Sequence, residues 1–196
     1  MKVINFLSLV LFAISSYAGV APKPSSFKVN PADSKVEWFA TKITGAHNGT
    51  VAVKSGILDF DGEKLTAGKI EMDMTTIAVT DLQGEWGQKL LGHLKSDDFF
   101  SVEKNPNALL VISTAQWTSA NTYNMTGNLT IKGITKPITF TSIINKAAGT
   151  ATAEIKVDRT EYNIKYNSGK FFPSIGDKMV NDIFTLKVAL AFEKAI

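Results

Sequence analysis

Few residues in this chain could perform acid–base or nucleophilic chemistry. His93 precedes Asp97 and Asp98 at a spacing that could give a general base with an orienting carboxylate. No serine, cysteine or second histidine stands in a recognisable nucleophile setting, and His47 lies in a turn-like Gly-Ala-His-Asn-Gly stretch. We therefore interpret His93 as a structural, hydrogen-bonding histidine and predict that the protein is not an enzyme. The catalytic alternative is a hydrolase of exported esters. In that case, replacing His93 by alanine would abolish turnover.

Metal and thiol chemistry lack suitable ligands. The chain has no cysteine and two histidines, and no spacing of His, Asp or Glu is typical of a zinc site. The absence of cysteine also excludes disulfides and thiolate nucleophiles. We therefore predict neither a metal nor another cofactor.

Arg159 is the one arginine among the 21 Lys and Arg residues. A guanidinium binds a carboxylate through two parallel hydrogen bonds, which the point charge of lysine cannot do. Asp158 and Asp177 are the carboxylates that we expect to pair with it. The favoured interpretation is a clamp on the long segment after Arg159, and contact with a ligand head group is the alternative.

Most of the chain alternates between apolar and polar residues, which predicts β-strands to position these groups. In 69–74, for example, Ile70, Met72 and Met74 share one face. Eight segments are predicted as strands: 35–41, 50–60, 69–74, 108–117, 123–132, 138–145, 150–158 and 184–192.

Two stretches interrupt the alternation. Apolar residues recur at helical spacing from Leu82 through Trp86 to Leu94, which predicts an amphipathic helix over 82–95. The stretch 161–178 contains two glycines and a proline and is predicted as a long loop with a helical turn. The fold class is therefore all-β, with eight antiparallel strands and one or two short helices. The strands could stack as a sandwich, but closure into a barrel removes their exposed edges.

The chain begins with the pattern of a secretory signal peptide over 1–18. Lys2 precedes a short apolar run, and Ser16 and Ala18 place small residues at −3 and −1, so cleavage is predicted after Ala18. A membrane anchor is the alternative, but it would need about 20 apolar residues. The prediction is therefore a periplasmic or secreted protein.

Length, composition and charge fit one domain. The chain has 196 residues, of which 44% are hydrophobic and 20% charged, enough for a sizeable core. The formal net charge is +3 without a basic stripe, so we predict no nucleic-acid partner. Residues 19–26 are predicted as a flexible leader and 27–196 as the single barrel domain.

An eight-stranded barrel is just wide enough to be filled by side chains or to hold one small ligand. Slim or pliable inward candidates, such as Met72, Gly127 and Ala151, favour a tube with free space. A register shift of one residue would move any lining residue to the other face. By alternation, the predicted lining is Ile70, Met72, Met74, Val111, Met125, Leu129, Phe140, Ile155, Leu186 and Val188.

Four motifs give the chain a family resemblance. They are HLKSDDFFSVEKNP at 93–106, GNLTIKGITKPITF at 127–140, DRTEYNI at 158–164 and SIGDKMVNDI at 174–183. On these motifs the chain resembles the YceI-like family of exported bacterial proteins. The resemblance implies a lipocalin-like barrel that holds a long amphiphile, typically a polyisoprenoid, without established catalysis. One departure lies at 161–163, where Glu-Tyr-Asn stands in place of a frequent Asp-Phe-Gly.

The first of these motifs contains His93, Asp98, Phe99 and Phe100. The two phenylalanines are apolar anchors, worth about 1.5–3 kcal/mol each if buried. We expect them to fix the preceding helix across one end of the barrel, either as a lid over a ligand or as a structural plug.

The functional hypothesis is a barrel that binds a long-chain amphiphilic lipid, first of all a polyisoprenoid, for carriage, storage or sequestration in the periplasm. The alternative is a structural or partner-binding barrel with a filled interior. The sequence leaves open a transient membrane contact for lipid exchange and the formation of a homodimer.

Overall fold

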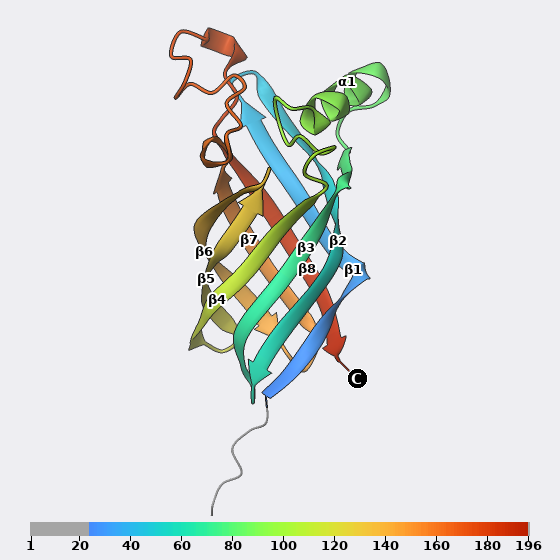
Figure 1. The fold of residues 1–196 in the computed structure, drawn as a ribbon, viewed down its shortest axis with the longest axis vertical. Coiled ribbons are helices and arrows are strands. Elements are labelled where there is room, and N and C mark those ends of the chain that lie inside the picture. Colours follow the sequence, from blue (N-terminus) through green and yellow to red (C-terminus); the bar gives the residue numbers. More distant parts are fainter. Residues whose placement is uncertain (1–23, 196) are drawn as a thin grey trace, which may run out of the picture.

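A computed structural model describes residues 24–195 as a closed barrel of eight antiparallel strands (Figure 1). Each strand pairs with the next, and β8 pairs with β1. The predicted eight-stranded barrel is therefore confirmed. The strands are β1 (Pro24–Lys42), β2 (Gly45–Asp61), β3 (Lys64–Val79), β4 (Asn107–Ser119), β5 (Thr122–Ile131), β6 (Ile134–Asn145), β7 (Thr150–Asp158) and β8 (Ile183–Lys194).

The helix predicted over 82–95 is present as α1 (Gly84–Lys95). Its buried face includes Gly87 and Leu94, and it packs near β3. Trp86 was predicted on the apolar face but is 72% exposed. It precedes Gly87 by one residue and therefore points about 100° away from the buried stripe.

The long loop predicted over 161–178 is also found, with two short 3-10 helices at its ends. They are η1 (Arg159–Tyr162) and η2 (Gly176–Lys178), and both lie in the connection between β7 and β8. Most of this connection therefore has no regular secondary structure.

The predicted signal peptide and most of the predicted leader lie outside the described residues. The leader prediction is wrong for 24–26, because Pro24 and Ser26 already pair with Asp61 and Asp59 as the start of β1. A flexible leader was inferred from proline and serine content, but pairing with β2 outweighs that local tendency.

Strand β1 is longer than predicted because a bulge accommodates Pro31. The register shifts between Asn30 and Lys35 against β8. Within the bulge, the Asn30 side-chain oxygen accepts from the Ala32 N–H at 3.0 Å, and the Ser34 hydroxyl donates to the Asn30 carbonyl at 2.7 Å. These local bonds replace ladder bonds, so the strand continues on both sides of the proline.

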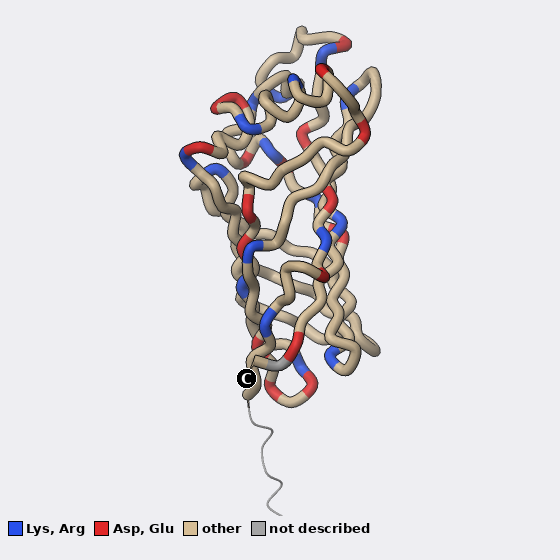
Figure 2. Tube along the Cα trace, turned by 90° about the vertical axis from the view of Figure 1, so that its right-hand side faces the viewer, with Lys and Arg blue, Asp and Glu red and all other residues tan. Residues whose placement is uncertain are grey.

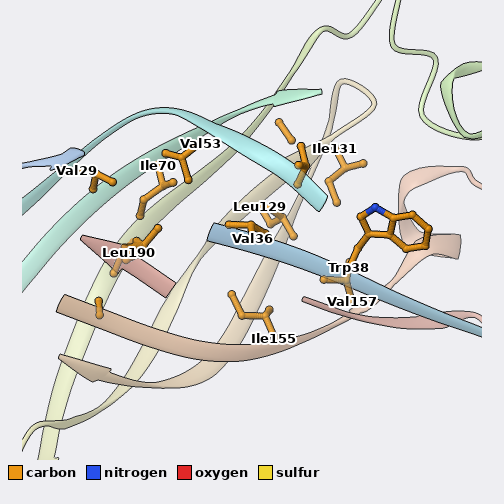
Figure 3. Close-up of a cluster of buried hydrophobic side chains, with 14 of the residues drawn as sticks. Val29, Val36, Trp38, Val53, Ile70, Leu129, Ile131, Ile155, Val157 and Leu190 are labelled. Atoms are coloured by element: carbon orange, nitrogen blue, oxygen red, sulfur yellow. The ribbon is translucent and has the colours of Figure 1, made fainter. Parts of the chain in front are cut away.

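The hydrophobic core fills the inside of the barrel. In β5, Tyr123, Met125 and Leu129 are buried while the residues between them are mostly exposed. Figure 3 shows such side chains reaching the same interior from several strands. The period-two pattern therefore separates a continuous apolar interior from a polar outer wall.

The two ends of the barrel differ. The β3–β4 connection, which contains α1, and the β7–β8 connection lie at one end, here called the capped end (Figure 1). Short turns join β2 to β3, β4 to β5 and β6 to β7 at the opposite end. Long connections that can cover the interior are therefore confined to the capped end.

The seam between β6 and β7 is the shortest pairing in the barrel. It extends only over Ser142–Asn145 with Thr150–Ala153. Toward the capped end the two strands do not pair, and η1 lies beside β6. The barrel wall is therefore held least firmly along this seam, next to the start of the β7–β8 connection.

Charges on the outer wall are dispersed. Basic and acidic residues alternate along the length of the barrel, and no one stripe collects them (Figure 2). Within residues 24–195, no helix combines the length and the apolar character needed to cross a membrane. Charge therefore singles out no face of the wall.

Candidate functional site

The barrel encloses an apolar cavity of about 130 Å³. Side chains from every strand line it, and no charged residue of the described chain is among them. Two lining residues carry hydroxyls, Ser142 and Thr152, and the Ser142 hydroxyl already donates to the Thr152 carbonyl at 2.9 Å. The cavity therefore suits an apolar chain rather than a polar or charged group.

Nine of the ten residues predicted to line the tube have positions on the cavity wall. The prediction for Val111 is wrong, because its side chain is 38% exposed while Leu110 and Ile112 line the cavity. Residues 108–112 are all apolar, so alternation could not indicate which set faces inward. The nine are Ile70, Met72, Met74, Met125, Leu129, Phe140, Ile155, Leu186 and Val188.

The sequence analysis missed further lining residues on β1 and β6. Val36, Trp38 and Ile138 contribute to the wall, and the Trp38 indole N–H donates to the Ala78 carbonyl at 3.1 Å. Alternation in the predicted strands 35–41 and 138–145 was the signal that could have identified them.

Aromatic packing closes the opposite end of the tube. The ring centroids of Phe27 and Phe60 are 5.1 Å apart, and those of Phe27 and Phe192 are 5.7 Å apart. The Lys146 ammonium lies over two of these rings and donates to the Gly62 carbonyl and, at 3.2 Å, to a Glu63 carboxylate oxygen. This end is therefore a tightly packed floor.

At the capped end, the turn after α1 contacts the tube. Phe100 lines the cavity and packs against Phe184 with 6.4 Å between ring centroids. No residue of α1 lines the cavity. The helix therefore contributes to the cap indirectly, through Phe99 and Phe100 in the turn that follows it.

His93 forms no dyad with either nearby carboxylate. Its imidazole packs edge-on against Tyr166 and Phe99, with centroid distances of 4.2 and 5.6 Å, and its Nε2 is buried without a hydrogen-bond partner. Asp97 instead accepts from Lys104 at 2.5 Å and from the Ser101 hydroxyl. These bonds hold the pKa of Asp97 below its ordinary value. The predicted hydrogen-bonding role of His93 is therefore replaced by aromatic packing within the cap.

Asp98 lies beside Asp97 on one wall of a cleft outside the barrel. The other wall of this cleft belongs to the β7–β8 connection and includes Tyr166 and Phe171. Asp98 is thus a surface residue of the cap, remote from the apolar tube.

Arg159 is the centre of the β7–β8 connection and is 2% exposed. Its guanidinium donates to four backbone carbonyls at 2.8–3.0 Å, and at 3.3 Å to a carboxylate oxygen of Asp182. Burial lowers its pKa, and Asp182 and Asp158 partly oppose that shift. The acceptor carbonyls belong to Ile164, Tyr166, Val180 and Asn181.

The clamp expected of Arg159 is present, but the predicted ion-pair partners are wrong. Asp158 accepts from the N–H and hydroxyl of Thr160 as the cap of η1, and Asp177 is exposed on η2. The true partner, Asp182, is 23 residues away in sequence, so only the folded connection brings it to the guanidinium.

The departure at 161–163 preserves a tight turn after η1. Asn163 has φ of 57°, a left-handed conformation that asparagine tolerates better than most residues. Tyr162 is buried, and its pKa is raised to about 12, mainly by burial and to a smaller extent by the charges of Glu161 and Asp158. The loop therefore keeps a glycine-like turn without a glycine.

One imidazole–carboxylate pair was not predicted. His47 Nδ1 lies 2.9 Å from an Asp81 carboxylate oxygen, and the Asn48 N–H donates to the other oxygen at 3.1 Å. Burial raises the pKa of Asp81, but these hydrogen bonds outweigh it and the net shift is downward. The pair ties the start of β2 to the segment after β3. In 24–195 no three or more His, Cys, Asp and Glu residues are grouped so as to hold a metal ion.

Comparison with known proteins identifies the family. The profile of the YceI-like domain matches residues 27–192. A UPF0312 protein of Pseudomonas putida is 34% identical over 98 residues, which cover 50% of this chain and 49% of that protein. A UPF0312 protein of Azotobacter vinelandii is 32% identical over 90 residues, or 46% and 45% of the two chains. The chain thus spans about half the length of the curated relatives it matches.

Solved structures share the fold at low identity. Burkholderia cenocepacia BcnA aligns with a TM-score of 0.66 and 21% identity, over 83% of this chain and 98% of that one. A polyisoprenoid binding domain from Saccharophagus degradans aligns with a TM-score of 0.58 and 9% identity, over 87% and 99%. A Campylobacter jejuni YCEI protein aligns with a TM-score of 0.53 and 18% identity, over 100% and 99%.

Proposed function

The chain belongs to the YceI-like family, and on that premise we propose that its barrel binds a long-chain amphiphilic lipid and sequesters the tail from water. The cavity that carries this proposal is closed at one end by aromatic packing and lined by apolar side chains along its length. A polyisoprenoid is the favoured ligand, and the polyisoprenoid binding domain with the same fold supports that choice.

Burial of methylene groups can supply the free energy that holds a tail in the tube. Each buried methylene contributes about 0.8 kcal/mol, so ten would contribute about 8 kcal/mol before the costs of ordering and association. The cavity of about 130 Å³ is smaller than the roughly 300–1,000 Å³ of ordinary ligand pockets. A tail must therefore be slim, and a longer one requires pliable lining residues such as Met72, Met74 and Met125 to change rotamer.

The polar head is expected at the capped end. No charged residue of the described chain lines the tube, the Ser142 hydroxyl already donates to the Thr152 carbonyl, and the opposite end is filled by Phe27, Phe60 and Phe192. The head is therefore expected at the mouth of the tube, beside Phe100 and Phe184.

The signal-peptide pattern in 1–18 supports an exported protein that carries, stores or sequesters its lipid in the periplasm. We regard it as a binding protein and not an enzyme, and the polyisoprenoid binding domain that shares its fold supports this view. Contact with a membrane would be transient and serve lipid exchange.

The test is native mass spectrometry of protein purified from its own host without detergent, followed by organic extraction. We expect a bound species of several hundred daltons whose tail is identified in the extract. A protein that stays ligand-free after incubation with polyprenyl lipids would refute lipid binding and favour a structural barrel.

A further inference from the structure

Exposed apolar side chains gather at the capped end. Six of the ten large hydrophobic residues exposed on the described surface lie there: Ile43, Trp86, Tyr166, Phe171, Phe172 and Ile183. Four of these six are aromatic, whereas Trp117 is the one exposed aromatic at the opposite end. The barrel therefore has one end whose surface is unusually rich in exposed aromatic groups.

Two of these aromatics are adjacent in the β7–β8 connection, in a segment here called the tip loop (163–176). Phe171 and Phe172 are 39% and 50% exposed. Their N–H groups both donate to the carbonyl of the buried Ser168, at 3.2 and 2.9 Å. These two N–H groups are therefore paired within the loop, while both phenyl rings stay exposed beside the cleft.

The tip loop is fixed to the barrel. Arg159 donates to the Ile164 and Tyr166 carbonyls, and the Val180 N–H donates to the Asn167 carbonyl at 2.8 Å. A Cβ on Gly169 would lie 2.7 Å from the Met179 sulfur, so the loop also packs closely on the chain that returns to β8. Its aromatic side chains are therefore presented in a defined arrangement.

Charge selects the partner of this surface. The tip loop contains Lys165 and Lys170 and no acidic residue. The Lys165 ammonium lies 4.9 Å from the centroid of the Phe171 ring, which places a cation directly beside the exposed aromatics. Asp97 and Asp98 face the loop across the cleft, where Lys104 pairs with Asp97. Exposed Glu161 and Asp177 flank the tip loop, so its positive charge is confined to Lys165 and Lys170, with Lys165 beside the exposed Phe171 ring.

We propose that the tip loop docks the capped end of the barrel on an anionic lipid bilayer. Aromatic side chains flanked by lysines suit the boundary between acyl chains and anionic head groups. Docking there would bring the Phe100 side of the tube against the source of its ligand. The inference deepens the proposed lipid-binding function and names the surface through which exchange occurs.

The test measures binding to vesicles by flotation, with protein purified in its processed form and its N-terminus established by mass spectrometry. The vesicles are phosphatidylcholine alone, or phosphatidylcholine with phosphatidylglycerol at 7:3. The tip variant is F171S/F172S, and the matched control I57S/I143S removes two exposed hydrophobics from the barrel wall. The charge variant is K165Q.

We expect the unaltered protein to prefer vesicles with phosphatidylglycerol, the tip variant to lose at least tenfold in partitioning, and the wall control to match the unaltered protein. K165Q should lose about fivefold on anionic vesicles only. Equal binding by the tip variant, or no vesicle binding by the unaltered protein, would overturn the proposal.

Ligand loading is measured separately, by native mass spectrometry with a polyprenyl lipid delivered from detergent and without vesicles. The tip variant should load normally there, because its substitutions do not touch the cavity. Failure of the unaltered protein to load would refute the lipid-binding function. Normal loading together with absent docking would refute only the bilayer surface.

Discussion

Filling the tube should make the protein more stable and inactive as a lipid carrier. Ala153 lines the cavity on β7, and its register partners are Ser142 on β6 and Val188 on β8. At about 24 cal/mol per Å³, an unfilled space of 130 Å³ costs about 3 kcal/mol. The Ala153→Leu substitution adds three carbon atoms, worth about 2.4 kcal/mol if fully buried. Repacking costs of about 1 kcal/mol leave an expected gain of about 1–2 kcal/mol.

The assay is urea unfolding of delipidated protein, paired with native mass spectrometry after incubation with a polyprenyl lipid. The control Ala189→Leu makes the same change on the exposed face of β8 and should alter stability by no more than about 0.5 kcal/mol. Ala153→Leu should unfold at higher urea concentration and bind little lipid. The cavity reasoning fails if the variant is destabilised by more than about 1 kcal/mol or still loads like the unaltered protein.

Three further substitutions test other parts of the structure. Met72→Glu should abolish lipid copurification while the circular dichroism of the barrel persists, because a charge would face the apolar cavity. The control Met72→Leu should keep the lipid. Normal loading of the Glu variant would contradict this choice of lining. Arg159→Met should lower the free energy of unfolding in urea by about 3–5 kcal/mol, because it leaves Asp182 and four carbonyls without their cation. A decrease under about 1 kcal/mol would show that water replaces the guanidinium. Asp97 has a lowered pKa, so its carboxylate stabilises the fold above pH 4 and less as pH falls through the folded pKa. The stability deficit of Asp97→Asn at pH 7 should therefore shrink below about pH 4, and a deficit independent of pH would refute that role.

Alternation predicted the strands because each strand of a closed barrel needs one apolar face. That need produces an alternation of apolar and polar residues within each strand. The same rule failed at Val111, because consecutive apolar residues do not indicate which side chains face inward. It also missed the first residues of β1, because pairing with β2 is a long-range interaction that Pro24 and Ser26 do not signal. Sequence thus predicts where strands lie better than where they begin.

The cap was harder to predict because its contacts join distant segments. Arg159 was correctly interpreted as a clamp from its chemistry alone, yet the four carbonyls that it binds have no side-chain signature. Asp182 could not be preferred over Asp158 or Asp177 without the fold of the connection. His93 has the spacing of a catalytic group, but packing between Phe99 and Tyr166 decides its role.

The unequal ends of the barrel indicate where its contents can exchange. At the opposite end, Phe60 and Leu65 are almost completely buried, and opening it would separate a packed aromatic cluster. At the capped end, Phe100 and Phe184 are only partly buried, and the β7–β8 connection is held largely by hydrogen bonds to backbone carbonyls, several of them from the Arg159 guanidinium. Elements with few buried apolar contacts open at lower free energy than a packed core. The capped end, beside the short β6–β7 seam, is therefore the end at which the proposed exchange of lipid is expected.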